Sequence, residues 1–184
     1  MTPEQGRTLI EFVRASIAEQ FGGPKVQQPS GEEWLNVPTA LFVTLHRDGD
    51  LRGCIGTMEP RRSLFDEVVD KAKAAAFDDP RMMPVEAHEL PELDIEITLL
   101  HPLEPIDART EEELLPQLRP HVDGLVLRSR QGSALFLPSV WKELPEPKAF
   151  VRALMYKAHL FRWPADLRAL RFAADVVSAA PVKA

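Results

Sequence analysis

The chain lacks the features that mark secreted and membrane proteins. Cys54 is its single cysteine among 184 residues, so no disulfide can form within the chain, which favours a reducing compartment. The segment from Met1 to Gln5 has neither the basic nor the apolar region of a secretory signal. No apolar run approaches the roughly 20 residues that cross a bilayer. We therefore expect a cytoplasmic protein with no membrane partner.

Motifs for metals and cofactors are equally scarce. The sequence contains no His-x-x-x-His and no paired Cys-x-x-Cys, and one cysteine excludes a self-contained iron–sulfur cluster. A Gly-rich phosphate loop, a serine nucleophile elbow and a Rossmann fingerprint are also absent. Asp94 and Glu96 could bind a cation together with His88, but a solvated strand face explains them as well. We expect neither a metal nor a cofactor.

Positive charge is in deficit, with 22 Lys and Arg against 28 Asp and Glu and a net charge of -6. Phosphate backbones repel an acidic chain, so general nucleic-acid binding is disfavoured. One segment, Lys148 to Arg171, is an exception. It contains six basic residues and a single acidic residue, Asp166. Its aromatic residues Phe161 and Trp163 could stack on a base. The alternative, which the acidity of the whole chain favours, is a helix with solvated charges and buried aromatics.

What is present indicates a globular α+β protein. Apolar residues make up 45% and charged residues 27% of the chain, the usual mix for a folded domain. Three- and four-residue apolar steps predict helices, and alternation between turn signals predicts strands. The helices are expected over 3–21, 63–77, 110–119 and 148–160, and the strands over 41–46, 51–57, 93–99, 124–128, 134–137 and 170–177. Because hairpins join most strands, we predict an antiparallel or mixed sheet packed by helices.

The clearest local signal is a hairpin around the Asp48-Gly49 turn dipeptide. Side chains alternate across a strand, so Leu51, Gly53 and Ile55 are predicted to share one face. Arg52, Cys54 and Gly56 share the other face. If the first face meets the core, the thiol and the guanidinium lie side by side on the second.

Cys54 is the first candidate for chemistry. Arg52 would supply positive charge near the thiol, and Gly53 and Gly56 would let a ligand come close. The alternative is that the glycines permit tight packing and that Cys54 is a small buried apolar residue. On the local pattern alone, the structural interpretation is favoured.

A cysteine nucleophile usually needs a histidine base, and none of the histidines has a diagnostic spacing. His46 lies nearest, because it ends the strand predicted to pair with the Cys54 strand. The unknown register leaves open which face His46 shares with Cys54. The chain has five histidines, His46, His88, His101, His121 and His159.

The sequence from Leu51 to Gly56, Leu-Arg-Gly-Cys-Ile-Gly, resembles the signature of the AMMECR domain family. Further matches follow in order along about residues 7 to 178. They are Phe42-Val43-Thr44-Leu45, Asp79-Pro80-Arg81, Glu89-Leu90, Ile95-Glu96-Ile97, Asp123-Gly124-Leu125, Leu137-Pro138 and Lys157-Ala158. Departures from the family pattern occur at Ala40, Ser139 and His159, and none touches Arg52 or Cys54.

The resemblance implies a single AMMECR domain over residues 1–184, with a larger lobe, a smaller lobe and a cleft lined by the motif. The larger lobe would come from the N- and C-terminal parts. The region of about 102–145, with its own predicted short helix and hairpin, could form the smaller lobe. Members occur in bacteria, archaea and eukaryotes, and prokaryotic ones are often encoded beside a Memo-type protein and a radical-SAM protein. The resemblance implies a functional link to those proteins but no reaction.

Two hypotheses follow. The first is a small-molecule enzyme or accessory enzyme in which Cys54 is the nucleophile or a ligand-contacting thiol. Arg52 would bind an anionic group, with Gly53 and Gly56 allowing close approach. The supporting polar residues would be Arg81, Glu96 and Lys157. The second hypothesis is a non-catalytic module that binds a protein or nucleic acid through the motif face or the Lys148–Arg171 segment.

Overall fold

The computed structural model describes residues 1–182 and has an α+β fold, as predicted. The chain forms two compact units, one from Met1–Leu100 together with the segment that begins at Asp175, and one from His101–Ala174. Each unit contains one four-stranded sheet, and the strands pair antiparallel. Within residues 1–182, no helix is long and apolar enough to cross a membrane.

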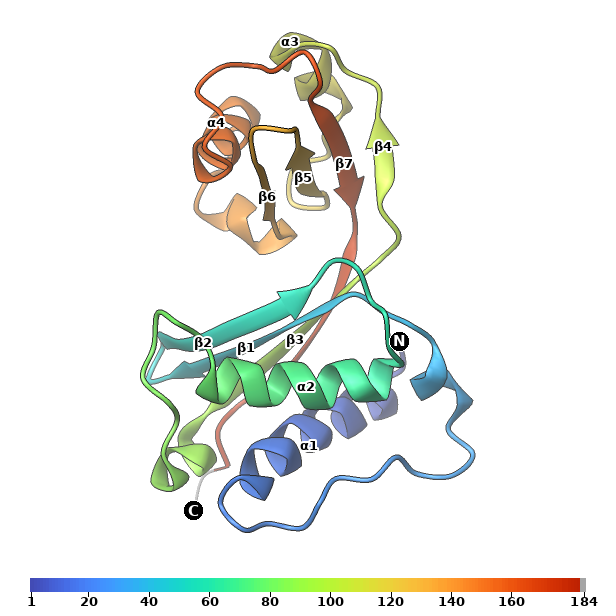
Figure 1. Ribbon diagram of the computed structural model, residues 1–184, viewed down its shortest axis with the longest axis vertical. Helices are drawn as coiled ribbons and strands as arrows, with labels where there is room; N and C mark the ends of the chain where they lie inside the picture. Colours follow the sequence, from blue (N-terminus) through green and yellow to red (C-terminus); the bar gives the residue numbers. More distant parts are fainter. Residues whose placement is uncertain (183–184) are drawn as a thin grey trace. The chain divides into compact units, whose positions relative to one another are not determined.

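The first unit packs two helices on one face of its sheet, with the strand order β2-β1-β3-β8. Figure 1 shows the two helices side by side along that face. The elements are α1 (Pro3–Glu19), β1 (Leu41–Arg47), β2 (Asp50–Thr57), α2 (Leu64–Phe77), β3 (Asp94–Leu100) and β8 (Ala174–Ala179), with the 3-10 helices η1 (Glu33–Asn36) and η2 (Ala87–Glu92). The core lies between sheet and helices, where Val13 and Val68 meet Val43 and Ile97, all fully buried.

Both helices begin where their capping residues predict. Thr2 Oγ1 accepts a hydrogen bond from Gln5 N at 3.2 Å, and Gln5 Oε1 accepts one from Thr2 N at 2.9 Å. Ser63 Oγ accepts from Asp66 N at 3.1 Å at the start of α2. These bonds satisfy amide groups that have no partner inside the helix.

The second unit has the strand order β4-β7-β5-β6. Its core centres on Trp141, whose ring stacks on that of Phe150 at a centroid distance of 3.8 Å. The predicted small-lobe range of about 102–145 falls inside this unit. Its elements are β4 (Glu104–Ile106), α3 (Glu111–Leu114), η3 (Leu115–Gln117), β5 (Gly124–Arg128), β6 (Ser133–Phe136), η4 (Pro138–Lys142), α4 (Pro147–Lys157) and β7 (Arg168–Phe172).

Two element predictions were wrong in extent, and one strand was not predicted. The expected strand over 170–177 is two strands, β7 and β8, in different sheets. The alternation of side chains runs through both strands and does not indicate which strand each one pairs with. The helix over 110–119 is one α-turn followed by η3, since Pro116 cannot donate a backbone hydrogen bond. Strand β4 was not predicted because it contains Pro105, which an edge strand tolerates.

Candidate functional site: the Cys54 strand

The strand register brings Cys54, Thr44 and Glu96 into one row across three strands. Thr44 of β1 lies opposite Cys54 of β2 and, on its other side, opposite Glu96 of β3. Directly opposed residues point to the same face of a sheet. With neighbouring strands about 4.8 Å apart, the Cα atoms of Cys54 and Glu96 are roughly 10 Å apart. His46 lies opposite Leu51 and not opposite Cys54.

The predicted division of β2 into two faces is confirmed for Gly53 and Ile55, which pack against the helical core. It was wrong for Leu51, which is exposed, and for Arg52, whose guanidinium joins Arg47 at Glu89 instead of lying beside the thiol. The register shifts between Leu45 and His46, so the strand carries a bulge before Gly53. A bulge adds one residue and rotates the side chains that precede it.

Both motif glycines lie where a side chain has no room. A Cβ atom at Gly53 would lie well under 3.0 Å from the backbone oxygen of Ala75 in α2. At Gly56 it would meet the Phe42 ring and the Leu41 backbone oxygen, also under 3.0 Å. This close packing supports the structural interpretation of the two glycines, which the sequence left open.

The backbone of Cys54 is held by an ion pair that follows α2. Cys54 N donates to Asp79 Oδ2 at 2.9 Å, and Arg81 Nη2 donates to Cys54 O at 3.1 Å. Arg81 also binds Asp79 through Nε at 2.9 Å and Nη2 at 2.6 Å. Because β2 is an edge strand, its outward N–H and C=O groups lack a neighbouring strand. The Asp79–Arg81 pair supplies the missing acceptor and donor.

The electrostatics of this clamp follow from its geometry. Asp79 is only 4% exposed. The Arg81 guanidinium, and then the Cys54 and Arg81 amide groups, hold the pKa of Asp79 far below its usual range against the opposing effect of burial. Asp79 therefore stays ionised, and so continues to bind Cys54 N–H, throughout the physiological pH range.

Cys54 is a partly exposed residue, and its thiol accepts a hydrogen bond from Thr44 Oγ1 at 3.3 Å. The carboxylate of Glu96, in the same row, is also partly exposed and has no hydrogen-bond or ion-pair partner within residues 1–182. The row thus combines a thiol in a fixed position with a carboxylate that remains available to a ligand.

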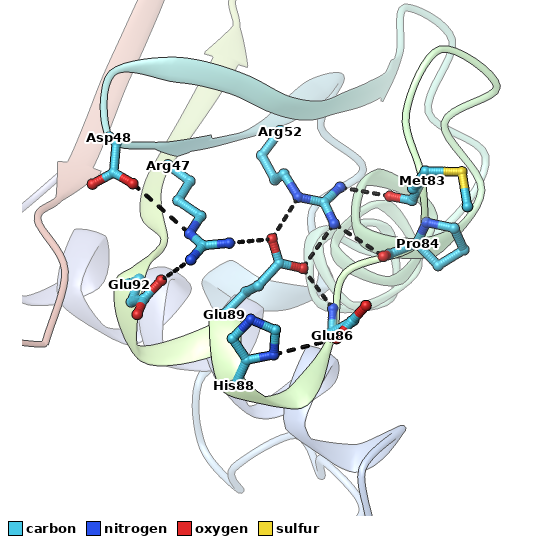
Figure 2. A network of polar contacts seen from close by, with 9 residues as sticks. All are labelled: Arg47, Asp48, Arg52, Met83, Pro84, Glu86, His88, Glu89 and Glu92. Atoms are coloured by element: carbon cyan, nitrogen blue, oxygen red, sulfur yellow. Dashed lines mark hydrogen bonds and ion pairs between the residues drawn. The ribbon is translucent and has the colours of Figure 1, made fainter.

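Arg52 is engaged in a separate network, centred on Glu89 (Figure 2). Arg52 Nε donates to Glu89 Oε1 at 2.9 Å and Nη2 to Oε2 at 2.8 Å. The same guanidinium donates to Met83 O at 2.5 Å and to Pro84 O at 2.9 Å. Arg52 therefore fastens β2 to the segment between α2 and β3, and four of its bonds are already made.

Glu89 accepts hydrogen bonds from two arginines and one amide. Arg47 Nη1 donates to Glu89 Oε1 at 3.0 Å, and Glu86 N donates to Oε2 at 2.7 Å. Glu89 is 5% exposed. Arg52, followed by the Glu86 amide and Arg47, lowers the pKa of Glu89 to about 2, although burial alone would raise it.

The remaining predicted site residues are Arg81 and Lys157. Arg81 reaches the Cys54 carbonyl, as described above, whereas Lys157 belongs to the second unit. There its Nζ donates to Leu135 O at 3.2 Å and lies 5.2 Å from the centre of the Phe136 ring. No group of three or more His, Cys, Asp or Glu side chains within residues 1–182 could hold a metal ion.

Sequence reasoning missed three residues of the site, Asp79, Glu89 and Thr44. All three appeared only in segments that match the family, with no role assigned to their side chains. One signal for Glu89 was available, because two arginines on one hairpin, Arg47 and Arg52, require a nearby counter-charge if they are partly buried. No local pattern identifies which acid, 37 residues further along the chain, provides it.

Comparison with known proteins identifies the family. A model of the AMMECR1 family matches residues 10–177. A protein of Methanothermobacter thermautotrophicus is 35% identical over 78% of this chain and 76% of its own length. Protein MJ0810 of Methanocaldococcus jannaschii is 34% identical over 76% of this chain and 71% of its own. The crystal structure of an uncharacterized protein, PH0010 of Pyrococcus horikoshii, superposes with a TM-score of 0.86 at 29% identity, covering 96% of this chain and 92% of that one. The chain belongs to the AMMECR1 family.

Proposed function

We propose that the protein is a small-molecule enzyme or accessory enzyme whose ligand lies against the row of Cys54, Thr44 and Glu96. The observation that carries the proposal is the way in which hydrogen bonds fix the backbone of Cys54 and orient its thiol. Its N–H and C=O are both fixed by the Asp79–Arg81 pair, while the residue is partly exposed and its thiol accepts a hydrogen bond from Thr44. A positioned, accessible thiol is what a nucleophile or ligand-contacting cysteine requires.

The roles of the neighbouring residues follow from their contacts. Arg81 and Asp79 position Cys54. Arg52 binds the segment between α2 and β3 and not a ligand, because its guanidinium already makes four hydrogen bonds there. Gly53 and Gly56 allow α2 and Phe42 to pack against β2. Glu96 is the acidic group available to accept a proton or a hydrogen bond from the ligand.

The rate of Cys54 alkylation by iodoacetamide in the native protein tests this function, and the single cysteine makes the reaction site-specific. We expect the folded protein to be modified, because Cys54 is partly exposed. Thr44→Val keeps the side-chain shape but removes the hydroxyl that donates to Sγ. It should therefore slow the modification, because the hydrogen bond stabilises the thiolate that attacks the reagent.

A serine control separates reactivity from exposure, since Thr44→Ser retains a hydroxyl and should react at the wild-type rate. If Cys54 reacts only after the protein unfolds, Cys54 is a packing residue and the proposed function fails. The proposed function also fails if Thr44→Val is modified as fast as the wild-type protein.

A second candidate function, a non-catalytic binding module, is favoured by one observation in the second unit. Phe161 is 82% and Tyr156 is 73% exposed, and their rings meet edge to face at 6.4 Å. They line a hollow of about 400 Å³ together with Arg152, Arg162 and Trp163. A saturable, salt-dependent quench of tryptophan fluorescence by oligouridine, lost in Phe161→Ser, would support nucleic-acid binding there. Absence of the quench would contradict it.

A further inference from the structure

A polar hollow lies in the first unit where the motif strand ends. It has a volume of about 480 Å³ and is lined by the end of β2, the segment that follows it and the first turns of α2. This volume falls within the range of small-molecule sites. The lining residues used below are Arg61, Arg62, Glu67 and Lys71.

Glu67 is the unusual member of this lining. The residue is 3% exposed, and its Oε2 atom has no hydrogen-bond partner within residues 1–182. Two cations lie near this carboxylate, both beyond ordinary hydrogen-bond length: Lys71, whose Nζ is 3.7 Å from Oε2, and Arg62, whose Nε is 3.7 Å from Oε1. A buried acceptor without a donor carries a free-energy cost, so an unpaired oxygen that lines a hollow indicates a donor supplied from outside the chain.

The cations around Glu67 differ in how far they are already engaged. Arg62 Nη2 pairs with Asp70 at 2.9 Å, and Lys71 Nζ pairs with the same carboxylate at 2.8 Å. The guanidinium of Arg61 is exposed and makes no hydrogen bond or ion pair within residues 1–182. Arg61 is therefore free to bind an anion, while Arg62 and Lys71 add fixed positive charge.

We propose that this hollow binds a small anion that also carries a hydroxyl group, of the class of phosphorylated polyols. The guanidinium of Arg61 forms paired hydrogen bonds with the phosphate. A hydroxyl of the same molecule donates to Glu67 Oε2 and satisfies the buried oxygen. The site uses neither Cys54 nor Glu96, so it stands or fails separately from the function proposed above.

The test is a titration of the full chain, followed by the NMR shifts of amide groups in residues 56–71. Glycerol 3-phosphate serves as the probe, up to about 10 mM, a range suited to a site with a Kd near 1 mM. Sulfate, which has no donor, and glycerol, which has no charge, are the comparisons. We expect saturable shifts with glycerol 3-phosphate, at least tenfold weaker ones with sulfate, and none with glycerol.

Two variants assign the interaction to its residues. Arg61→Met should weaken glycerol 3-phosphate binding at least tenfold, whereas Arg7→Met, which removes an exposed arginine from α1, should leave it unchanged. Glu67→Gln replaces the charged acceptor with a neutral one, so the preference for glycerol 3-phosphate over sulfate should fall. The proposal is overturned if glycerol 3-phosphate gives no saturable shifts in 56–71, or if Arg61→Met binds it like the wild type.

Discussion

Replacing Glu89 with alanine is expected to destabilise the first unit by about 3–5 kcal/mol, the range for removing one partner of a buried ion pair. Arg52 and Arg47 would then keep their positive charges in partly buried positions without the shared carboxylate. The segment between α2 and β3 would also lose its main attachment to β2 (Figure 2). Urea denaturation, with hydrogen exchange of peptides from β1 and β2, measures the loss.

A control within the same segment is Glu86→Ala. Glu86 is exposed, and its side chain pairs with the exposed His88 at 3.3 Å. Exposed pairs contribute little, so this change should stay within about 0.5 kcal/mol. Equal effects of Glu86→Ala and Glu89→Ala would contradict the central role of Glu89 in the network.

Glu89→Gln tests how the same carboxylate makes the unfolding free energy depend on pH. The pKa of Glu89 falls from its ordinary 4.5 to about 2 in the folded protein. The stabilisation is therefore complete above about pH 4.5 and is lost as the pH falls through about 2, on the order of 3 kcal/mol in all. In the variant, which has no titrating group here, the drop in unfolding free energy between pH 4.5 and 2 should be smaller by that amount.

The parts of this site that the sequence predicted depend on local signals. The Asp48-Gly49 turn, the alternation from Gly53 to Ile55 and the capping residues Thr2 and Ser63 each act within a few residues. They were sufficient for the hairpin, for directing Gly53 and Ile55 toward the core, and for placing the Cys54 thiol on the other face. The same reasoning failed at Leu51 because the strand contains a bulge. One inserted residue moves the side chains before it to the opposite face of the sheet.

The parts that could not be predicted depend on contacts between distant residues. Cys54 meets Asp79 across 25 positions, and Arg52 meets Glu89 across 37. The charge of each group can be read from the sequence, but its partner cannot. An arginine that binds a ligand and an arginine that binds a loop of the same chain have the same local sequence signal. Arg52 was accordingly expected to bind an anion, whereas its hydrogen bonds are directed to Glu89 and two carbonyl groups.

The two interpretations of the motif glycines differ in what they predict for Gly53→Ala. If Gly53 is there for packing, the added methyl group would overlap the backbone of Ala75, which a side-chain rotation cannot relieve. The helix α2 cannot easily withdraw, since Val68 and Ala72 are fully buried in the core. We therefore expect a loss of about 3 kcal/mol, the upper part of the range for overpacking.

Gly49→Ala provides the comparison for this change in urea denaturation. Gly49 has φ +88° and nothing within 4 Å of an added Cβ, so it reports backbone strain without a clash, about 1 kcal/mol. A loss of unfolding free energy that is clearly larger for Gly53→Ala than for Gly49→Ala assigns Gly53 to helix–strand packing. Hydrogen exchange of α2 should then be slower in the wild type than in Gly53→Ala. A loss no larger than at Gly49 would mean that α2 yields to the methyl group. The absence of a side chain at Gly53 would then have to be explained by the approach of a ligand to the strand of Cys54.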